Sequence, residues 1–96
     1  DMHMLVVDDD ARLRSLLRDY LTKEGFRVTQ AEDAADARRK IASLTFDIMI
    51  LDVMMPGESG LDLAKSIRQE VGVPILMLTA RADDLDQVLG LGSWGR

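Results

Sequence analysis

Several features are absent from this sequence of 96 residues, and their absence limits the classes of protein to which it can belong. It has no cysteine, which excludes a disulfide framework and a thiolate metal site. No apolar run approaches the roughly 20 residues that a membrane-spanning helix needs, and the first residues do not match a signal-peptide pattern. We therefore expect a cytoplasmic location and no membrane partner.

The composition predicts one small globular domain that occupies residues 1–96. Apolar residues make up 47% of the chain, which is enough for a packed core, and charged residues make up 30%, as in ordinary soluble domains. The formal net charge of -5 argues against nucleic-acid binding by this chain alone, because a nucleic-acid binder needs a surplus of basic residues.

Short apolar runs alternate with stretches of helical spacing. The runs predict strands at residues 3–8, 26–31, 47–52 and 74–79, and the stretches between them predict three longer helices, with a short fourth at about 84–91. The predicted apolar faces of the three longer helices are, in order, Leu13, Leu16, Leu17, Tyr20 and Leu21; Ala34, Ala37, Ile41 and Leu44; Leu61, Ala64, Ile67 and Val71.

Capping residues agree with these boundaries. Asp10, Asp33 and Ser59 are placed to accept hydrogen bonds from the first turns of the three longer helices. Gly25 is placed to end the first helix in the left-handed conformation, and Gly72 to stop the third.

The order of elements predicts an α/β fold with a doubly wound parallel sheet. Apolar strands that do not alternate with polar residues are buried on both faces, which is typical of a parallel sheet between two layers of helices. The run at 26–31 does alternate, as expected of an edge strand.

Polar residues stand at the carboxyl ends of three predicted strands. Asp8 and Asp9 end the first, Asp52 ends the third and Thr79 ends the fourth. Ligands of open parallel sheets bind beyond these ends, where the strand order reverses. If the order is 2-1-3-4, the three carboxylates converge on one crevice, with Thr79 one strand further along.

Three carboxylates in one crevice repel one another and require a cation. Ligands that are all oxygen favour a hard ion such as Mg²⁺, which also neutralises charge on a transferring phosphoryl group. A carboxylate beside such an ion can act as a nucleophile and form an acyl phosphate, and the Thr79 hydroxyl can donate to a phosphoryl oxygen. These residues therefore support phosphorylation of an aspartate.

Four motifs resemble the receiver domain of bacterial two-component response regulators. They are Leu-Val-Val-Asp-Asp-Asp at residues 5–10, Asp-Ile-Met-Ile-Leu-Asp-Val-Met-Met-Pro-Gly at 47–57, Ser-Gly at 59–60 and Pro-Ile-Leu-Met-Leu-Thr-Ala at 74–80. The resemblance covers residues 3 to about 93 and implies a flavodoxin-like fold. The residues of these motifs are most similar to those of regulators that carry a winged-helix DNA-binding output domain. Such an output domain lies outside this chain.

The resemblance implies roles for individual residues. Asp52 is the expected phosphoacceptor, Thr79 the switch hydroxyl and Ala80 the small residue that leaves room for the phosphoryl group. The implied Mg²⁺ ligands are Asp8 through water, Asp9 and Asp52 directly, and the backbone carbonyl of Met54. The implied partner is a histidine kinase, and the implied activity is self-catalysed phosphotransfer and dephosphorylation, not that of an enzyme with its own substrate.

The sequence departs from the family pattern at its end. The family continues into a fifth strand, a lysine before a proline and a fifth helix, whereas this chain reads Trp-Gly-Arg at 94–96. Lys23, Lys40 and Lys65 belong to predicted helices and are not placed to substitute. Three explanations of this end are open: the terminus is damaged or out of frame, the chain is a deliberate fragment, or another copy of the chain fills the apolar strand edge at 75–78. The third explanation would give a homodimer or an edge-paired oligomer.

Two other functions compete with a phosphorylation switch. A degenerate receiver that acts only as an interaction module is favoured by the absent lysine. A Mg²⁺-dependent phosphatase is disfavoured because its nucleophile belongs after the first strand and the candidate here ends the third. We expect His3 at the surface, and solvated positions for five helical arginines, Arg12, Arg14, Arg18, Arg38 and Arg39.

Overall fold

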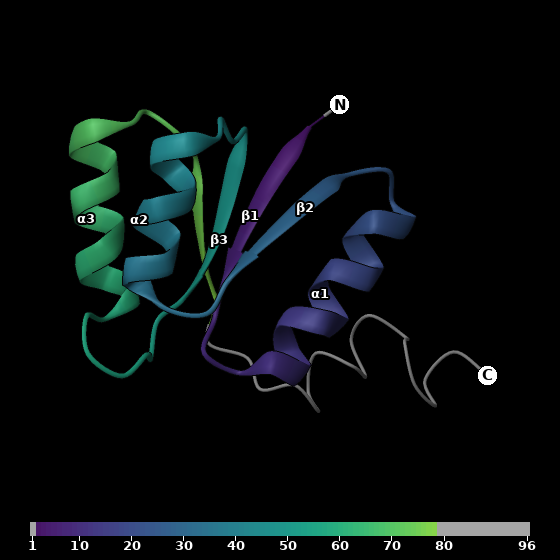
Figure 1. The fold of residues 1–96 in the computed structure, drawn as a ribbon, viewed down its shortest axis with the longest axis horizontal. Coiled ribbons are helices and arrows are strands. Elements are labelled where there is room, and N and C mark those ends of the chain that lie inside the picture. Colours follow the sequence, from purple (N-terminus) through teal and green to yellow (C-terminus); the bar gives the residue numbers. More distant parts are fainter. Residues whose placement is uncertain (1, 79–96) are drawn as a thin grey trace.

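In the computed structural model, strands and helices alternate along residues 2–78, which are the residues that the structure describes (Figure 1). The elements are β1 (His3–Val7), α1 (Ala11–Lys23), β2 (Arg27–Ala31), α2 (Ala34–Ser43), β3 (Ile48–Asp52), α3 (Gly60–Glu70) and β4 (Ile75–Leu78). The helix predicted at 84–91 lies outside the described residues. No helix within residues 2–78 is both long enough and apolar enough to cross a membrane.

The strands form one parallel sheet in the order β2-β1-β3-β4, which confirms the predicted order. β1 lies between β2 and β3, and all five of its residues are buried. β2 is an edge strand and begins with an exposed residue, in agreement with its alternating pattern. A strand with neighbours on both sides and helices above and below has no solvent-facing side, so β1 carries a continuous apolar run.

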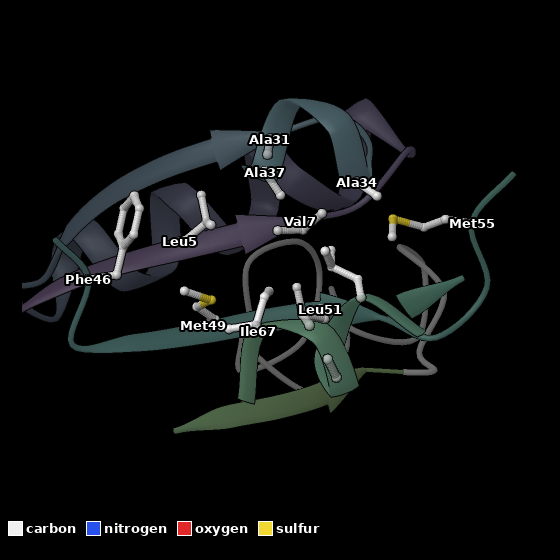
Figure 2. Packing of buried hydrophobic residues seen from close by; sticks show 12 residues of the cluster. Leu5, Val7, Ala31, Ala34, Ala37, Phe46, Met49, Leu51, Met55 and Ile67 are labelled. Atoms are coloured by element: carbon white, nitrogen blue, oxygen red, sulfur yellow. The ribbon is translucent and has the colours of Figure 1, made fainter. Parts of the chain in front are cut away.

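Two apolar cores cover the two faces of the sheet. Met4 and Val6 of β1 pack with Leu13 and Leu17 of α1 on one face. On the other face, Leu5 and the alternate residues of β1 and β3 pack against α2 and α3, as Figure 2 shows. Figure 1 places α1 on one side of the sheet and α2 with α3 on the other. The predicted doubly wound architecture is therefore confirmed.

The predicted caps are confirmed as well. Asp10, Asp33 and Ser59 accept hydrogen bonds from backbone N–H groups in the first turns of α1, α2 and α3, at distances between 2.8 and 3.2 Å. Gly25 follows α1 with a φ of 96°, a conformation that glycine adopts without a side-chain clash. The local sequence thus sets where these helices begin and where α1 ends.

Two predicted helix faces were wrong in detail. Leu44 lies just beyond α2 in an extended conformation and is 44% exposed, so it does not belong to the apolar face. Leu61 is 53% exposed, because α3 turns a neighbouring set of residues inward. The buried residues of α3 are Gly60, Leu63, Ala64 and Ile67.

The prediction that His3 lies at the surface was also wrong. His3 is buried, its ring stacks at a tilt against Phe46 with 4.6 Å between ring centroids, and its Nε2 lies 2.6 Å from the Thr29 hydroxyl. Its backbone N–H donates to the Asp47 carboxylate at 2.8 Å. These partners come from β2 and from the segment before β3. His3 therefore connects three segments at the amino-terminal end of β1, opposite the end that leads to Asp8.

The last described strand, β4, is paired with β3 on one side, and within residues 2–78 no strand pairs with its other side. Leu76 of this strand is 55% exposed. Exposed apolar strand edges favour pairing with further strands. Self-association of two copies through β4 stays a prediction.

Candidate functional site

The carboxyl ends of β1 and β3 bring three aspartates together. Val7 pairs with Leu51 across these neighbouring parallel strands, and the residue that follows each of them in the sequence is an aspartate, Asp8 or Asp52. One carboxylate oxygen each from Asp8, Asp9 and Asp52 lie within 4.8 Å of one another. The predicted convergence is found, and its cause is the register of two parallel strands.

Asp8 is the most enclosed member of the cluster. It is 2% exposed, and its backbone N–H donates to the carbonyl oxygen of Ala31 in β2 at 3.1 Å. Its Oδ1 accepts the N–H of Asp10 at 2.8 Å, while its buried Oδ2 has no hydrogen-bond donor among the described residues. A buried carboxylate oxygen without a donor is costly, and a bound cation would remove that cost.

Burial and nearby negative charges raise the pKa values of Asp8 and Asp52. Burial raises the pKa of Asp8 from 3.8 to about 7, and the hydrogen bond from the Asp10 N–H opposes this rise. The negative charges of Asp52, Asp9 and Asp10 raise the pKa further. Burial also raises the pKa of Asp52, with the Met54 N–H opposing and the charge of Asp9 contributing. The site thus disfavours the simultaneous ionisation that a divalent cation would stabilise.

Asp52 remains accessible at the end of β3. It is partly exposed, and its Oδ1 accepts the backbone N–H of Met54 at 3.2 Å. Met54 itself is 78% exposed. The role of the Met54 carbonyl as a metal ligand stays a prediction.

The predicted phosphate-binding pair, Thr79 and Ala80, lies outside the described residues. Leu78, the last residue of β4, pairs with Asp52 in the sheet. Thr79 follows Leu78 directly in the sequence. The roles of Thr79 and Ala80 stay predictions.

The structure adds Gly60 to the residues that shape this site. A Cβ at position 60 would lie 1.8 Å from the carbonyl oxygen of Asp52 and 2.7 Å from its carbonyl carbon. The Gly60 N–H donates to the carbonyl oxygen of Val53 at 3.2 Å. The first residue of α3 therefore packs directly on the backbone that carries the predicted phosphoacceptor. From the sequence, Gly60 was identified only as part of the Ser-Gly motif at 59–60.

We expect Gly60→Ala to destabilise the fold by about 3 kcal/mol or more, because a methyl group cannot be accommodated 1.8 Å from a backbone oxygen without moving α3 or the end of β3. Chemical denaturation followed by circular dichroism measures the loss. Gly72→Ala is the matched control, since a Cβ at position 72 meets nothing within 4 Å. Equal stability of the two variants would contradict this packing argument.

Arg14 is a second residue whose place was not predicted. Its Nη1 donates to the backbone carbonyl of Asp8 at 2.5 Å, and the side chain is half-buried. The expectation of a solvated position was therefore wrong for Arg14, whereas Arg18 and Arg39 are exposed. Position 14 follows the buried Leu13, at the border of the apolar face. Side chains tilt toward the N-terminus of a helix, which directs Arg14 back to the strand end.

The oxygen ligands that these aspartates offer fit a small, hard divalent cation. Three carboxylates supply only oxygen, and the buried Oδ2 of Asp8 has no protein donor among residues 2–78. Magnesium prefers oxygen ligands, binds through few carboxylates and keeps several waters, so an open cluster of this kind suits it.

Comparison with known proteins identifies the family. The model of the response regulator receiver domain matches residues 4–95, so this chain belongs to the family of response-regulator receiver domains. Protein PetR of Rhodobacter capsulatus is 49% identical over 93% of this chain, and the transcriptional regulatory protein ResD of Bacillus subtilis is 41% identical over 91%. The chain spans 38% and 36% of the lengths of these two relatives.

Solved structures agree with this assignment. The response regulator TrrA of Thermotoga maritima, in complex with Mg²⁺–BeF, superposes with a TM-score of 0.80 at 36% identity, covering 95% of this chain and 80% of its own. TrrA in complex with the histidine kinase ThkA matches with a TM-score of 0.78 at 41% identity, over 83% of this chain and 70% of the other. The flavodoxin-like fold expected from the sequence is confirmed.

Proposed function

We propose that this domain accepts a phosphoryl group from a histidine kinase on Asp52, in a reaction that depends on Mg²⁺. The observation that carries the proposal is the cluster of Asp8, Asp9 and Asp52, in which a buried carboxylate oxygen has no donor among the described residues. Membership of the receiver family supports the same assignment. The TrrA structure with Mg²⁺–BeF supports a magnesium site in a protein of this fold.

The three aspartates have different tasks in this proposal. Asp8, Asp9 and Asp52 would hold the cation, Asp8 through water, together with the backbone carbonyl of Met54. When bound, Mg²⁺ would neutralise negative charge on the carboxylates and on the phosphoryl oxygens. Asp52 is the nucleophile, because it is both partly exposed and anchored at the end of a rigid strand.

The proposed chemistry balances with a phosphorylated histidine as donor. A carboxylate oxygen of Asp52 attacks phosphorus, a P–O bond forms and the P–N bond to imidazole breaks. The departing imidazole keeps the electron pair and takes up a proton. The hydrogen bond from the Met54 N–H to Oδ1 of Asp52 favours one orientation of the carboxylate for this attack.

Partners and output belong to the same proposal. The complex of TrrA with the kinase ThkA supports a histidine kinase as the phosphodonor, and the transcriptional role of ResD supports a regulatory output. Any contact with DNA would be made by a part of a longer protein outside this chain, since the charge of -5 here does not favour it. A cytoplasmic location follows from such an output.

The domain is proposed to act as a switch and not as an enzyme with its own substrate. An interaction module without phosphorylation is the alternative. The two functions differ in what they demand of the acidic cluster. A switch needs a working cation site, whereas an interaction module does not.

Magnesium is therefore expected to stabilise the folded chain. A ligand present at 100 times its Kd adds about 2.7 kcal/mol to the free energy of unfolding. Thermal melts with and without Mg²⁺ measure the effect. Asp9→Asn should lose most of it, whereas Asp19→Asn, which removes an equal charge from an exposed residue of α1, should retain it. An unchanged melting temperature of the unsubstituted chain in Mg²⁺ would contradict the proposed cation site.

A further inference from the structure

Arg14 reaches back from α1 to the strand end that carries the acidic cluster. Its Nη1 lies 2.5 Å from the carbonyl oxygen of Asp8, six residues earlier in the chain. Asp8 follows the last residue of β1, so this carbonyl lies just past the strand. A guanidinium that donates to a backbone carbonyl forms a charge-assisted hydrogen bond, which is stronger than a neutral one.

The turn formed by residues 8–10 is held at several points. The Asp8 N–H donates to Ala31 at 3.1 Å, and the Asp10 N–H donates to the Asp8 carboxylate at 2.8 Å. Arg14 contacts both ends of the turn: its backbone N–H donates to the Asp10 carbonyl at 3.0 Å, and its side chain donates to the Asp8 carbonyl. One residue of α1 thus connects the two ends of the turn.

Holding the Asp8 carbonyl has a direct consequence for Asp9. The peptide group is planar, so a fixed carbonyl direction also fixes the plane that contains the backbone nitrogen of the next residue. That plane limits where the Cβ of Asp9 can point. Asp9 is exposed and, unlike Asp8, is not enclosed by the sheet, so its direction depends more on this turn.

We propose that Arg14 is a positioning residue of the acidic site, which orients the peptide between Asp8 and Asp9 so that both carboxylates can meet a divalent cation. The inference rests on the proposed function and deepens it, because it names a residue that sets cation affinity without contacting the cation. Removing a group that orients a metal ligand without contacting the metal commonly weakens metal affinity by about 10- to 100-fold.

Charge alone predicts the opposite effect. Arg14 is a permanent cation whose guanidinium contacts the backbone of the acidic site, and a like charge repels Mg²⁺. If Arg14 acted only through its charge, its removal would tighten Mg²⁺ binding. If it acts by orienting the turn, its removal weakens binding. The direction of the change in Kd therefore distinguishes the two roles.

The test compares Arg14→Met, Arg14→Lys and Arg18→Met in the full chain. Arg18→Met is the matched control, since it makes the same change one turn later in α1, where Arg18 pairs only with exposed Asp19 among the contacts that the structure shows. The Kd for Mg²⁺ is measured by amide chemical shifts in NMR titrations. Hydrogen exchange of the Asp10 amide is measured without metal, and melting temperatures monitor the fold.

We expect Arg14→Met to weaken Mg²⁺ binding about 10-fold and to accelerate exchange of the Asp10 amide. Arg14→Lys, which retains the charge and one donor, should fall between Arg14→Met and the unsubstituted chain in both measurements. Arg18→Met should match the unsubstituted chain. If Arg14→Met does not fold, the intermediate Kd of Arg14→Lys carries the test.

An equal or tighter Kd in Arg14→Met, or in Arg14→Lys if only that variant folds, would overturn the positioning role. Unchanged exchange of the Asp10 amide would overturn it independently of any metal. Failure of the unsubstituted chain to bind Mg²⁺ would instead overturn the proposed function. The two failures are distinguishable. The positioning role fails while the unsubstituted chain still binds Mg²⁺, whereas the proposed function fails when the unsubstituted chain does not bind Mg²⁺.

Discussion

Asp52→Asn is expected to abolish covalent phosphorylation of this domain. An asparagine amide keeps the size and one oxygen of the carboxylate, but it lacks the negative charge that makes Asp52 a nucleophile. With Mg²⁺ and acetyl phosphate, the unsubstituted chain should gain about 80 Da, the mass of one phosphoryl group, and Asp52→Asn should gain nothing. Intact-mass spectrometry measures both, and the adduct should be lost in base.

The control for this prediction is Asp47→Asn, which alters an aspartate five residues earlier that contacts the His3 backbone at the opposite end of β3. It should accept phosphate as the unsubstituted chain does, provided that it folds. An adduct of equal mass and yield on Asp52→Asn would contradict the assignment. Absence of an adduct on the unsubstituted chain, together with failure to bind beryllofluoride, would favour the interaction module.

Asp8→Asn is expected to stabilise the metal-free fold above pH 7 while abolishing its response to Mg²⁺. Burial raises the pKa of Asp8 from 3.8 to about 7, so between these two pH values the folded chain holds a proton that the unfolded chain has released. The stability that this proton provides is fully present below pH 3.8 and is lost as the pH rises through about 7.

The size of the effect follows from linkage. Within that window, Asp8 lowers the free energy of unfolding by up to about 1.4 kcal/mol per pH unit as the pH rises. Asp52 adds a change of the same sign, since burial raises its pKa too. Asparagine does not titrate and can still accept the Asp10 N–H, so we expect Asp8→Asn to gain about 2 to 4 kcal/mol at pH 8.

Urea denaturation in a metal chelator between pH 5 and pH 8.5 measures this difference. Asp19→Asn, which changes an exposed aspartate of α1, should follow the pH dependence of the unsubstituted chain. Mg²⁺ should restore stability to the unsubstituted chain at pH 8 and leave Asp8→Asn unchanged. Equal pH dependence of Asp8→Asn and the unsubstituted chain would show that the buried carboxyl group is not the source.

The acidic cluster has two opposed effects on this domain. Three carboxylates within 4.8 Å of one another destabilise the fold when they are ionised, and the same carboxylates make a cation site. A protein that keeps such a cluster retains a destabilising feature where function requires it. Substitutions that relieve the repulsion should therefore stabilise the fold and remove the proposed activity together.

Much of the fold could be predicted because its causes are local. The unbroken apolar run of β1 indicates burial on both faces, and the alternation in β2 indicates an edge. Asp10, Asp33 and Ser59 begin helices through hydrogen bonds to residues two or three positions later. The meeting of the strand-end aspartates also followed, because parallel neighbouring strands end at the same edge of a sheet.

Other features depend on how distant segments approach one another. His3 was expected at the surface, yet it is buried because Thr29, Phe46 and Asp47 surround it from two other parts of the chain. Leu61 was misplaced on the inner face of α3, which instead includes Gly60, packed directly on the Asp52 backbone. Neither contact leaves a periodic signal in the sequence.

The sequence by itself determined the order of elements, the helix caps and the identity of the acidic residues, since each depends on neighbours along the chain. Only the tertiary structure decided that Asp8 is buried, that its Oδ2 has no donor among residues 2–78 and that Arg14 holds its carbonyl. The physical reason is that burial and hydrogen-bond geometry are set by packing between segments. Distances of a few ångströms there decide whether a carboxylate is solvated or available to a cation.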